Sequence, residues 1–198
     1  MSRKEDTITY MKYDKLIICG LPKSFDIWDS VEYIDPTPEE HMVEDIKYDA
    51  YPLECEEDKG EDGLVVFKYD ESASGVYAVH NTITQTLALE LSPWAVEADV
   101  LLYASYANAV LAKHKRARLY DHFAPLPGIS EEAVSIMISD RKKHLKKLLA
   151  RNECFVMQGL NSSYSLYPSH LRPAPSAEMQ VHELQTTFVK MQWEFEED

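Results

Sequence analysis

Two short motifs in the sequence have residue types that could do chemistry, and both fail on spacing. The run 19–24, Cys-Gly-Leu-Pro-Lys-Ser, follows an apolar segment and ends in Lys-Ser as a phosphate-binding loop does. Such a loop needs glycines whose amides wrap the phosphates, but Pro22 stands before Lys23 and has no amide hydrogen. His182 followed by glutamate matches the start of a zinc-protease helix, but the second histidine is replaced by Thr186.

The other residues that could take part in catalysis are scattered along the chain. The seven histidines have no local partner at metal-ligand spacing, and the three cysteines are far apart. The chain has no Gly-x-Ser-x-Gly nucleophile motif. We therefore expect no catalytic residue, no metal site and no cofactor. A small enzyme or ligand-binding domain stays open as an alternative if separated residues converge on one site. Examples of such residues are His80, Glu97, Tyr120 and His122.

Acidic residues interleaved with aromatic ones form the strongest candidate for a functional surface. Between residues 26 and 71 there are 17 acidic residues against three lysines. Solvated charge alone does not need aromatic side chains, whereas at an interface they supply contact area while carboxylates steer a basic partner. The alternative is an ordinary acidic surface whose aromatic residues belong to the core. The predicted binding residues are Asp26, Trp28, Asp29, Glu32, Tyr33, Tyr48 and Tyr51.

A basic stretch follows in the second half of the chain. Between residues 113 and 151 there are ten basic residues against four acidic ones. The lysines at 142, 143, 146 and 147 share one side of a predicted helix and could bind nucleic acid or an acidic partner. The overall charge favours a solvated face that balances the acidic half of the chain. Arg141 falls inside the apolar stripe of that helix, so we expect it to pair with a buried carboxylate or to extend outward.

Composition and charge bound the class of protein and its partners. The 198 residues include 45% apolar and 27% charged residues, and the formal net charge is −14. This charge disfavours nucleic acid and anionic lipid as partners and favours a basic protein. The sequence begins without an apolar run of signal-peptide length, and the odd number of widely spaced cysteines suits a reducing compartment. We therefore expect a cytoplasmic protein without a membrane partner.

The elements that must position these residues indicate an α+β fold in a single domain, 1–198. A central meander over 64–91 should form a mostly antiparallel sheet, because Leu87, Leu89 and Leu91 alternate with smaller or polar residues. Two main helices, at about 92–115 and 130–150, are expected to pack against this sheet. Within this domain, residues 26–63 form an acidic, loop-rich segment.

Shorter elements complete the expected architecture. Residues 15–19 are predicted to form a buried strand, and residues 154–157 and 164–167 a pair of strands. Residues 37–40, Thr-Pro-Glu-Glu, have the pattern of a helix start. Residues 177–195 fit helical and strand spacing equally well, and threonines with nearby aromatic residues favour a final strand near 189–195.

These observations favour a non-catalytic protein-binding module, such as an inhibitor or immunity-type partner of a basic protein. The small enzyme or ligand-binding domain described above is one alternative. Another is an oligomeric structural component in which copies of the chain associate through an edge strand near the C-terminus.

Overall fold

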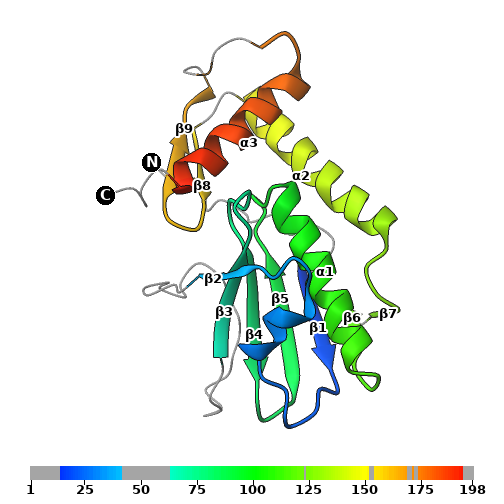
Figure 1. The fold of residues 1–198 in the computed structure, drawn as a ribbon. Coiled ribbons are helices and arrows are strands. Elements are labelled where there is room, and N and C mark those ends of the chain that lie inside the picture. The colour runs from blue at the N-terminus through cyan, green and yellow to red at the C-terminus, as the bar shows by residue number, and fades with distance from the viewer. Residues whose placement is uncertain are drawn as a thin grey trace, which may run out of the picture.

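The computed structural model describes residues 14–41, 63–122, 124–151, 154–168, 171 and 174–193. It confirms the α+β fold (Figure 1). In chain order, the elements are β1 (Lys15–Cys19), the 3-10 helix η1 (Asp29–Tyr33), β2 (Glu39–His41), β3 (Gly63–Lys68), β4 (Val76–Asn81), β5 (Thr86–Leu91), α1 (Glu97–Lys113), β6 (Arg118–Asp121), β7 (Ala124–Leu126), α2 (Glu131–Arg151), β8 (Phe155–Gln158), β9 (Ser163–Leu166) and α3 (Ala177–Trp193).

The main sheet contains seven described strands in the order β2-β3-β4-β5-β1-β6-β7. All neighbouring pairs are antiparallel, and β3, β4 and β5 form the meander expected from the sequence. The strand β1 is inserted between β5 and β6, where Ile17 lies opposite both Ala88 and Tyr120. Because side chains alternate along a strand, Leu16 and Ile18 point together into the core.

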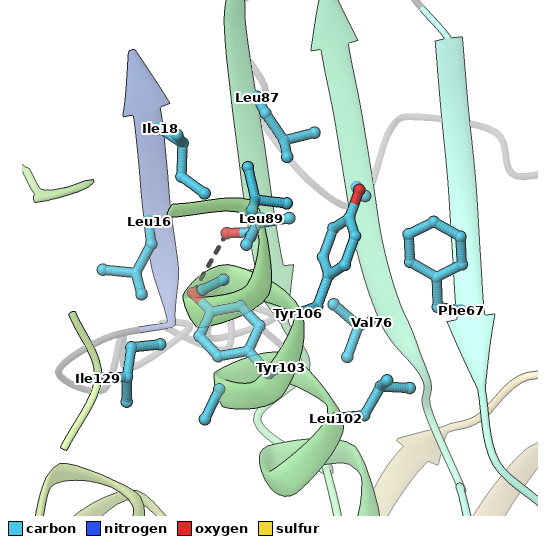
Figure 2. Packing of buried hydrophobic residues seen from close by; sticks show 14 of the residues in the cluster. Leu16, Ile18, Phe67, Val76, Leu87, Leu89, Leu102, Tyr103, Tyr106 and Ile129 are labelled. Atoms are coloured by element: carbon cyan, nitrogen blue, oxygen red, sulfur yellow. Dashed lines mark hydrogen bonds between the residues drawn. The ribbon is translucent and has the colours of Figure 1, made fainter. Parts of the chain in front are cut away.

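One face of this sheet is covered by α1, which lies along the strands with η1 beside it (Figure 1). Leu87 and Leu89 from the sheet pack against Leu102, Tyr103 and other apolar residues of the helix (Figure 2). The Tyr103 hydroxyl donates a hydrogen bond to the Leu89 carbonyl at 3.3 Å. This bond lets a large aromatic ring be buried completely without leaving its polar atom unsatisfied.

A second apolar cluster lies beyond the end of the sheet from which α1 starts (Figure 1). There α3 packs against the hairpin of β8 and β9. These two strands are antiparallel partners, as the sequence predicted. The helix α2 connects the two clusters, because Met137 belongs to the first and Leu145 to the second. Both side chains are buried, so the apolar stripe predicted for this helix has partners along its length.

The first long helix begins later than the sequence pattern indicates. Ser92 and Pro93 form a turn, and α1 starts at Glu97. The buried Asp99 carboxylate accepts hydrogen bonds from the amide of Val96 at 2.9 Å and from that of Gly75 at 2.9 Å. It also accepts weaker bonds from the amides of residues 73 and 74. Asp99 therefore closes the start of the helix and ties it to the β3–β4 turn.

The helix predicted to start at 37–40 is wrong. Residues Glu39–His41 form β2, whose backbone pairs with β3 from Lys68 to Val66. The pairing partner lies far along the sequence, and its ladder of hydrogen bonds outweighs a local capping pattern. The short helix in this part of the chain is η1, which lies earlier, at residues 29–33.

The final strand expected near 189–195 is also wrong as far as the chain is described, because α3 runs to Trp193. The fully buried residues Val181, Leu184, Phe188 and Gln192 recur at helical spacing. The Gln192 side-chain oxygen accepts hydrogen bonds from the amides of Asn161 at 3.0 Å and its neighbour at 3.1 Å. This helix thus holds the turn between β8 and β9, which a strand could not reach in the same way.

Among the described residues, none of the helices combines the length and the apolar character that a membrane crossing requires.

Candidate functional site: the acid–aromatic face

The segment from Phe25 to Ile34 separates its apolar and acidic side chains into two sets. Phe25, Ile27, Val31 and Ile34 are buried and join the core beneath α1. The acidic residues and the tryptophan between them point outward. We call the resulting outer surface the acid–aromatic face, and its members are Asp26, Trp28, Asp29, Glu32 and Tyr33. The structure thus brings together five of the seven predicted binding residues, while Tyr48 and Tyr51 lie outside the described residues.

Hydrogen bonds fix the backbone of this face. The Asp26 carboxylate accepts the Trp28 amide at 2.8 Å, which closes a tight turn before η1. The buried Ser30 hydroxyl donates to the Ile27 carbonyl at 2.6 Å and also contacts the Tyr106 hydroxyl of α1. Because Ser30 is inaccessible to water, this contact anchors η1 to α1 and holds the acid–aromatic face in one orientation.

The two aromatic rings of the face have different environments. Trp28 is 43% exposed, so a large part of its indole faces solvent. Tyr33 is half-buried against His114, and its ring lies 5.4 Å from the Lys113 ammonium group. The Tyr33 ring therefore already makes a cation–π contact within the chain. The Trp28 ring, in contrast, keeps a large exposed area.

The carboxylates of the face create a negative potential around it. Burial raises the pKa of the Tyr33 phenol, and the nearby charges of Asp29 and Asp26 raise it further. Within the described part of the chain, Asp26, Asp29 and Glu32 make no ion pairs. Among the described residues no cationic side chain therefore pairs with these carboxylates, and their negative potential extends into solvent over about one Debye length.

Acidic character continues from the face toward the β3–β4 turn. The Tyr69 hydroxyl donates to the Pro36 carbonyl at 3.1 Å, which brings the end of β3 beside residues 35 and 36. Burial and the Asp35 charge raise the pKa of the Tyr69 phenol. Asp70 and Glu71, which follow in the turn, are exposed. Residues 35–36 and 69, from the two ends of the acidic region 26–71, therefore lie next to each other.

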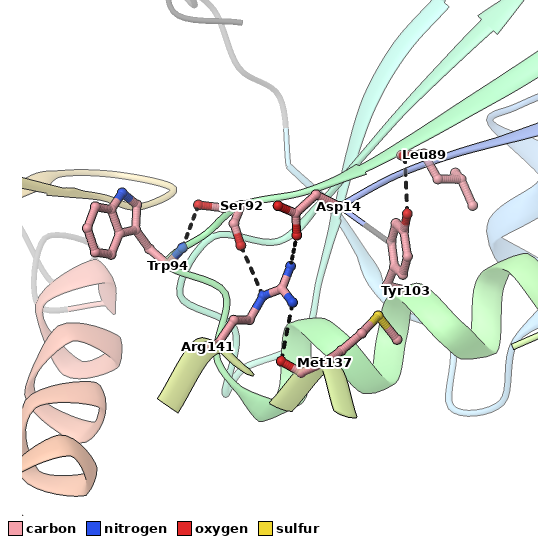
Figure 3. Close-up of polar contacts among 7 residues, drawn as sticks. All are labelled: Asp14, Leu89, Ser92, Trp94, Tyr103, Met137 and Arg141. Carbon is pink, nitrogen blue, oxygen red and sulfur yellow. Dashed lines mark hydrogen bonds and ion pairs between the residues drawn. The ribbon is translucent and has the colours of Figure 1, made fainter. Parts of the chain in front are cut away.

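Of the two alternatives that the sequence left for Arg141, pairing with a carboxylate or extending outward, the structure shows pairing (Figure 3). Its side chain is 1% exposed, and Nη2 lies 2.6 Å from the Asp14 carboxylate. The guanidinium also donates to the carbonyls of Ser92 at 3.2 Å and Met137 at 3.3 Å. These contacts join α2, the start of β1 and the turn before α1, so Arg141 has a structural role.

The basic side of α2 is balanced by acids of the helices. Lys142 pairs with Glu97 of α1, Lys143 with an aspartate of α2, and Lys146 with Glu178 of α3. None of these three partners belongs to the acidic stretch 26–71. Within the described residues, these lysines of α2 thus pair with acids of the helices and not with the acidic half of the chain that they were expected to balance.

Two of the separated residues considered for a catalytic site, His80 and Glu97, lie far apart. His80 contacts Phe25 near the end of α1 that carries His114. Glu97 lies at the opposite end of that helix, which at 1.5 Å per residue is about 25 Å away. His122 is exposed just after β6. In the described ranges, no three histidine, cysteine, aspartate or glutamate side chains are grouped so as to hold a metal ion.

Two features of the structure were beyond sequence reasoning. The first is Asp99, which is buried in the first turn of α1 and accepts several backbone amides. Burial outweighs these hydrogen bonds and raises the pKa of the Asp99 carboxyl. The contact of Glu97 with Lys142 is the second, because it joins residues on different helices. No local pattern in the sequence signals either one.

No protein-family model, no curated protein and no solved structure matches this chain.

Proposed function

We propose that this chain is a non-catalytic protein-binding module, of the inhibitor or immunity type, that binds a basic protein through the acid–aromatic face. One observation carries the proposal: Trp28 is 43% exposed among three exposed carboxylates that have no ion-pair partner in the described chain. Tryptophan is enriched among the residues that dominate binding energy at protein interfaces.

Electrostatics favours the same class of partner. The net charge of −14 attracts basic molecules at long range, and the carboxylates beside Trp28 supply the local field that orients them. Lysine or arginine side chains of the partner would lie between Asp26, Asp29 and Glu32 while an apolar part of the partner covers the indole. The Lys113 contact with Tyr33 shows the same chemistry within the chain.

We also propose that the protein works in the cytoplasm. Cys19 and Cys154 are free thiols in the structure, and Cys154 is exposed. Exposed free thiols persist where the surroundings are reducing. Measuring the oxidation state of these thiols in protein isolated under alkylating conditions tests this point, and an intermolecular disulfide would contradict it.

The test of the proposed function compares two variants of equal net charge. In the first, Asp26→Asn, Asp29→Asn and Glu32→Gln neutralise the acid–aromatic face. In the control, the exposed Glu131, Glu132 and Glu183 all become glutamine. Each variant and the wild-type protein are immobilised and used to capture basic proteins from a cell lysate at low salt.

We expect the wild-type protein and the control to retain the same basic protein, and the face variant to lose it. Raising the salt to several times the low-salt concentration should release the partner, since the Debye length shortens. The variant Trp28→Ala, which has the same charge as the wild type, should also fail to retain the basic protein. Equal retention by the face variant and the control would contradict the proposed function, because it would show that only overall charge matters.

A further inference from the structure

A groove of about 430 Å³ lies where the first turn of α1 meets the middle of α2. This volume suits a small-molecule ligand. Three lysines, two serines and one glutamate contribute the polar part of its lining, and an isoleucine the apolar part. The polar residues are Glu97, Ser135, Ser139, Lys142, Lys143 and Lys146. The groove is separate from the acid–aromatic face, which lies beside the opposite end of α1.

The donors in the groove lie along one side of α2. Ser135, Ser139, Lys142 and Lys146 are separated by four, three and four residues, which places them in one row on a helix. Two hydroxyl groups and two ammonium groups therefore point toward the same space. The row extends about 16 Å along the helix axis, so its donors can contact different phosphate groups of a pyrophosphate-sized ligand rather than the oxygens of one phosphate.

The lysines of the groove are available to a stronger anion. The Lys142 ammonium lies 3.5 Å from a Glu97 oxygen, and the two side chains are 44% and 61% exposed. Lys146 contacts Glu178, whose side chain is 71% exposed. Exposed pairs of this kind are weak because water screens them. A ligand with two or more negative charges can therefore replace these carboxylates as the partner of both lysines.

The lysines set the charge of the groove, because Glu97 and the Asp99 carboxylate already lie at the positive end of the α1 dipole. Within the lining, three ammonium groups outnumber the one carboxylate. We propose that this groove binds a small molecule that carries a phosphate or pyrophosphate group, held by Lys142, Lys146 and the two serine hydroxyls.

The surroundings of the groove favour a compact anion over a nucleic acid strand. Asp140 and Glu178 border the row of lysines, and Glu131 and Glu132 are exposed at the start of the same helix. A long polyanion would be repelled by these carboxylates along its length, whereas a single phosphate group reaches only the lysines. A nucleic acid is therefore the competing ligand that the test must include.

The test uses inorganic pyrophosphate as the probe and isothermal titration of the whole chain at low salt. We expect the wild-type protein to bind one pyrophosphate. The variant Lys142→Gln with Lys146→Gln should bind it about tenfold more weakly or worse, because it loses two charge-assisted contacts. Lys147→Gln with Arg151→Gln is the matched control, since both residues are exposed on α2, lie outside the groove lining and carry the same charge. It should bind within about twofold of the wild type, because neither side chain lines the groove.

A third variant keeps the test decisive even if the lysine variant folds poorly. Glu97→Gln removes the carboxylate that competes for Lys142, so it should bind pyrophosphate several-fold more tightly. The proposal is overturned if the wild type does not bind pyrophosphate, if the control loses as much affinity as the groove variant, or if Glu97→Gln leaves affinity unchanged. Binding of a short single-stranded DNA with the same lysine dependence, without pyrophosphate binding, would also overturn it in favour of nucleic acid.

Discussion

Replacing Asp14 with alanine should destabilise the protein strongly, because it leaves a buried charge without its partner. The Arg141 side chain is 1% exposed, and Asp14 provides its ion pair at 2.6 Å. Removing one partner of a buried ion pair costs about 3–5 kcal/mol. Since the Asp14 side chain is 11% exposed, water can partly replace it, and we expect the lower end, about 3 kcal/mol. For a chain of this size, that loss lowers the melting temperature by about 6–12 °C.

The double variant Asp14→Ala with Arg141→Met distinguishes a lost charge pair from lost packing. Methionine fills much of the same volume without a charge, so the double variant should be more stable than Asp14→Ala alone by about 1 kcal/mol or more. Urea unfolding followed by circular dichroism measures the free energy of unfolding of both variants and the wild type. A loss below about 1 kcal/mol for Asp14→Ala, or a double variant less stable than the single one, would refute the reasoning.

Three further changes test other parts of the structure. Asp99→Asn places an amide group against backbone N–H donors in a fully buried site, so we expect a loss of about 2–4 kcal/mol in urea unfolding, and a loss below about 1 kcal/mol would contradict the capping role. Burial lowers the pKa of His114, with help from Lys113, and it also lowers that of His144. A histidine with a lowered folded-state pKa contributes stability above its unfolded pKa, about 6.5, and loses it as the pH falls through the folded value. The wild type should therefore lose stability from pH 7 to pH 5, and His114→Gln or His144→Gln should reduce that loss. If thermal melts show the same decrease of melting temperature with pH in the variants as in the wild type, this explanation is wrong. Tyr106→Phe removes the hydroxyl contact with Ser30 and should cost about 1 kcal/mol, with faster amide exchange in η1 than in β4 as the specific signature.

Local periodicity predicted the main elements well. The alternation at Leu87, Leu89 and Leu91 identified β5, because one face of the sheet is buried under α1. The apolar stripe of α2 likewise predicted both its extent and the unusual position of Arg141. In these segments each residue's environment is set by a repeating spacing, which the sequence displays directly.

Long-range contacts decided the elements that the sequence did not predict. Glu39–His41 became a strand because β3 offers an unpaired edge, although the local pattern favoured a helix. In α3, the position of Gln192 against the β8–β9 turn favours the helix, and this contact spans about thirty residues of sequence. The groove between α1 and α2 follows the same rule, since Glu97 and Lys142 meet only after the helices pack.

The sequence predicted which segment holds the candidate site, but not which of its aromatic side chains are exposed. Acids and aromatic residues in one segment indicated a binding face, and the structure places Asp26, Trp28, Asp29 and Glu32 exposed along this segment; their role in binding stays a prediction. Which of the aromatic rings are exposed depends on the packing of Phe25, Ile27 and Val31 beneath α1. Tyr33 and Tyr69 are half-buried for that reason, and only the structure could separate them from Trp28.

Hydrogen–deuterium exchange of the protein with and without its captured basic partner tests the central claim most directly. If the acid–aromatic face is the binding surface, the amides from Asp26 to Ile34 become strongly protected in the complex, while those of α2 keep their exchange rates. Protection confined to α2 or α3, with Asp26 to Ile34 unchanged at saturating partner, would contradict the account.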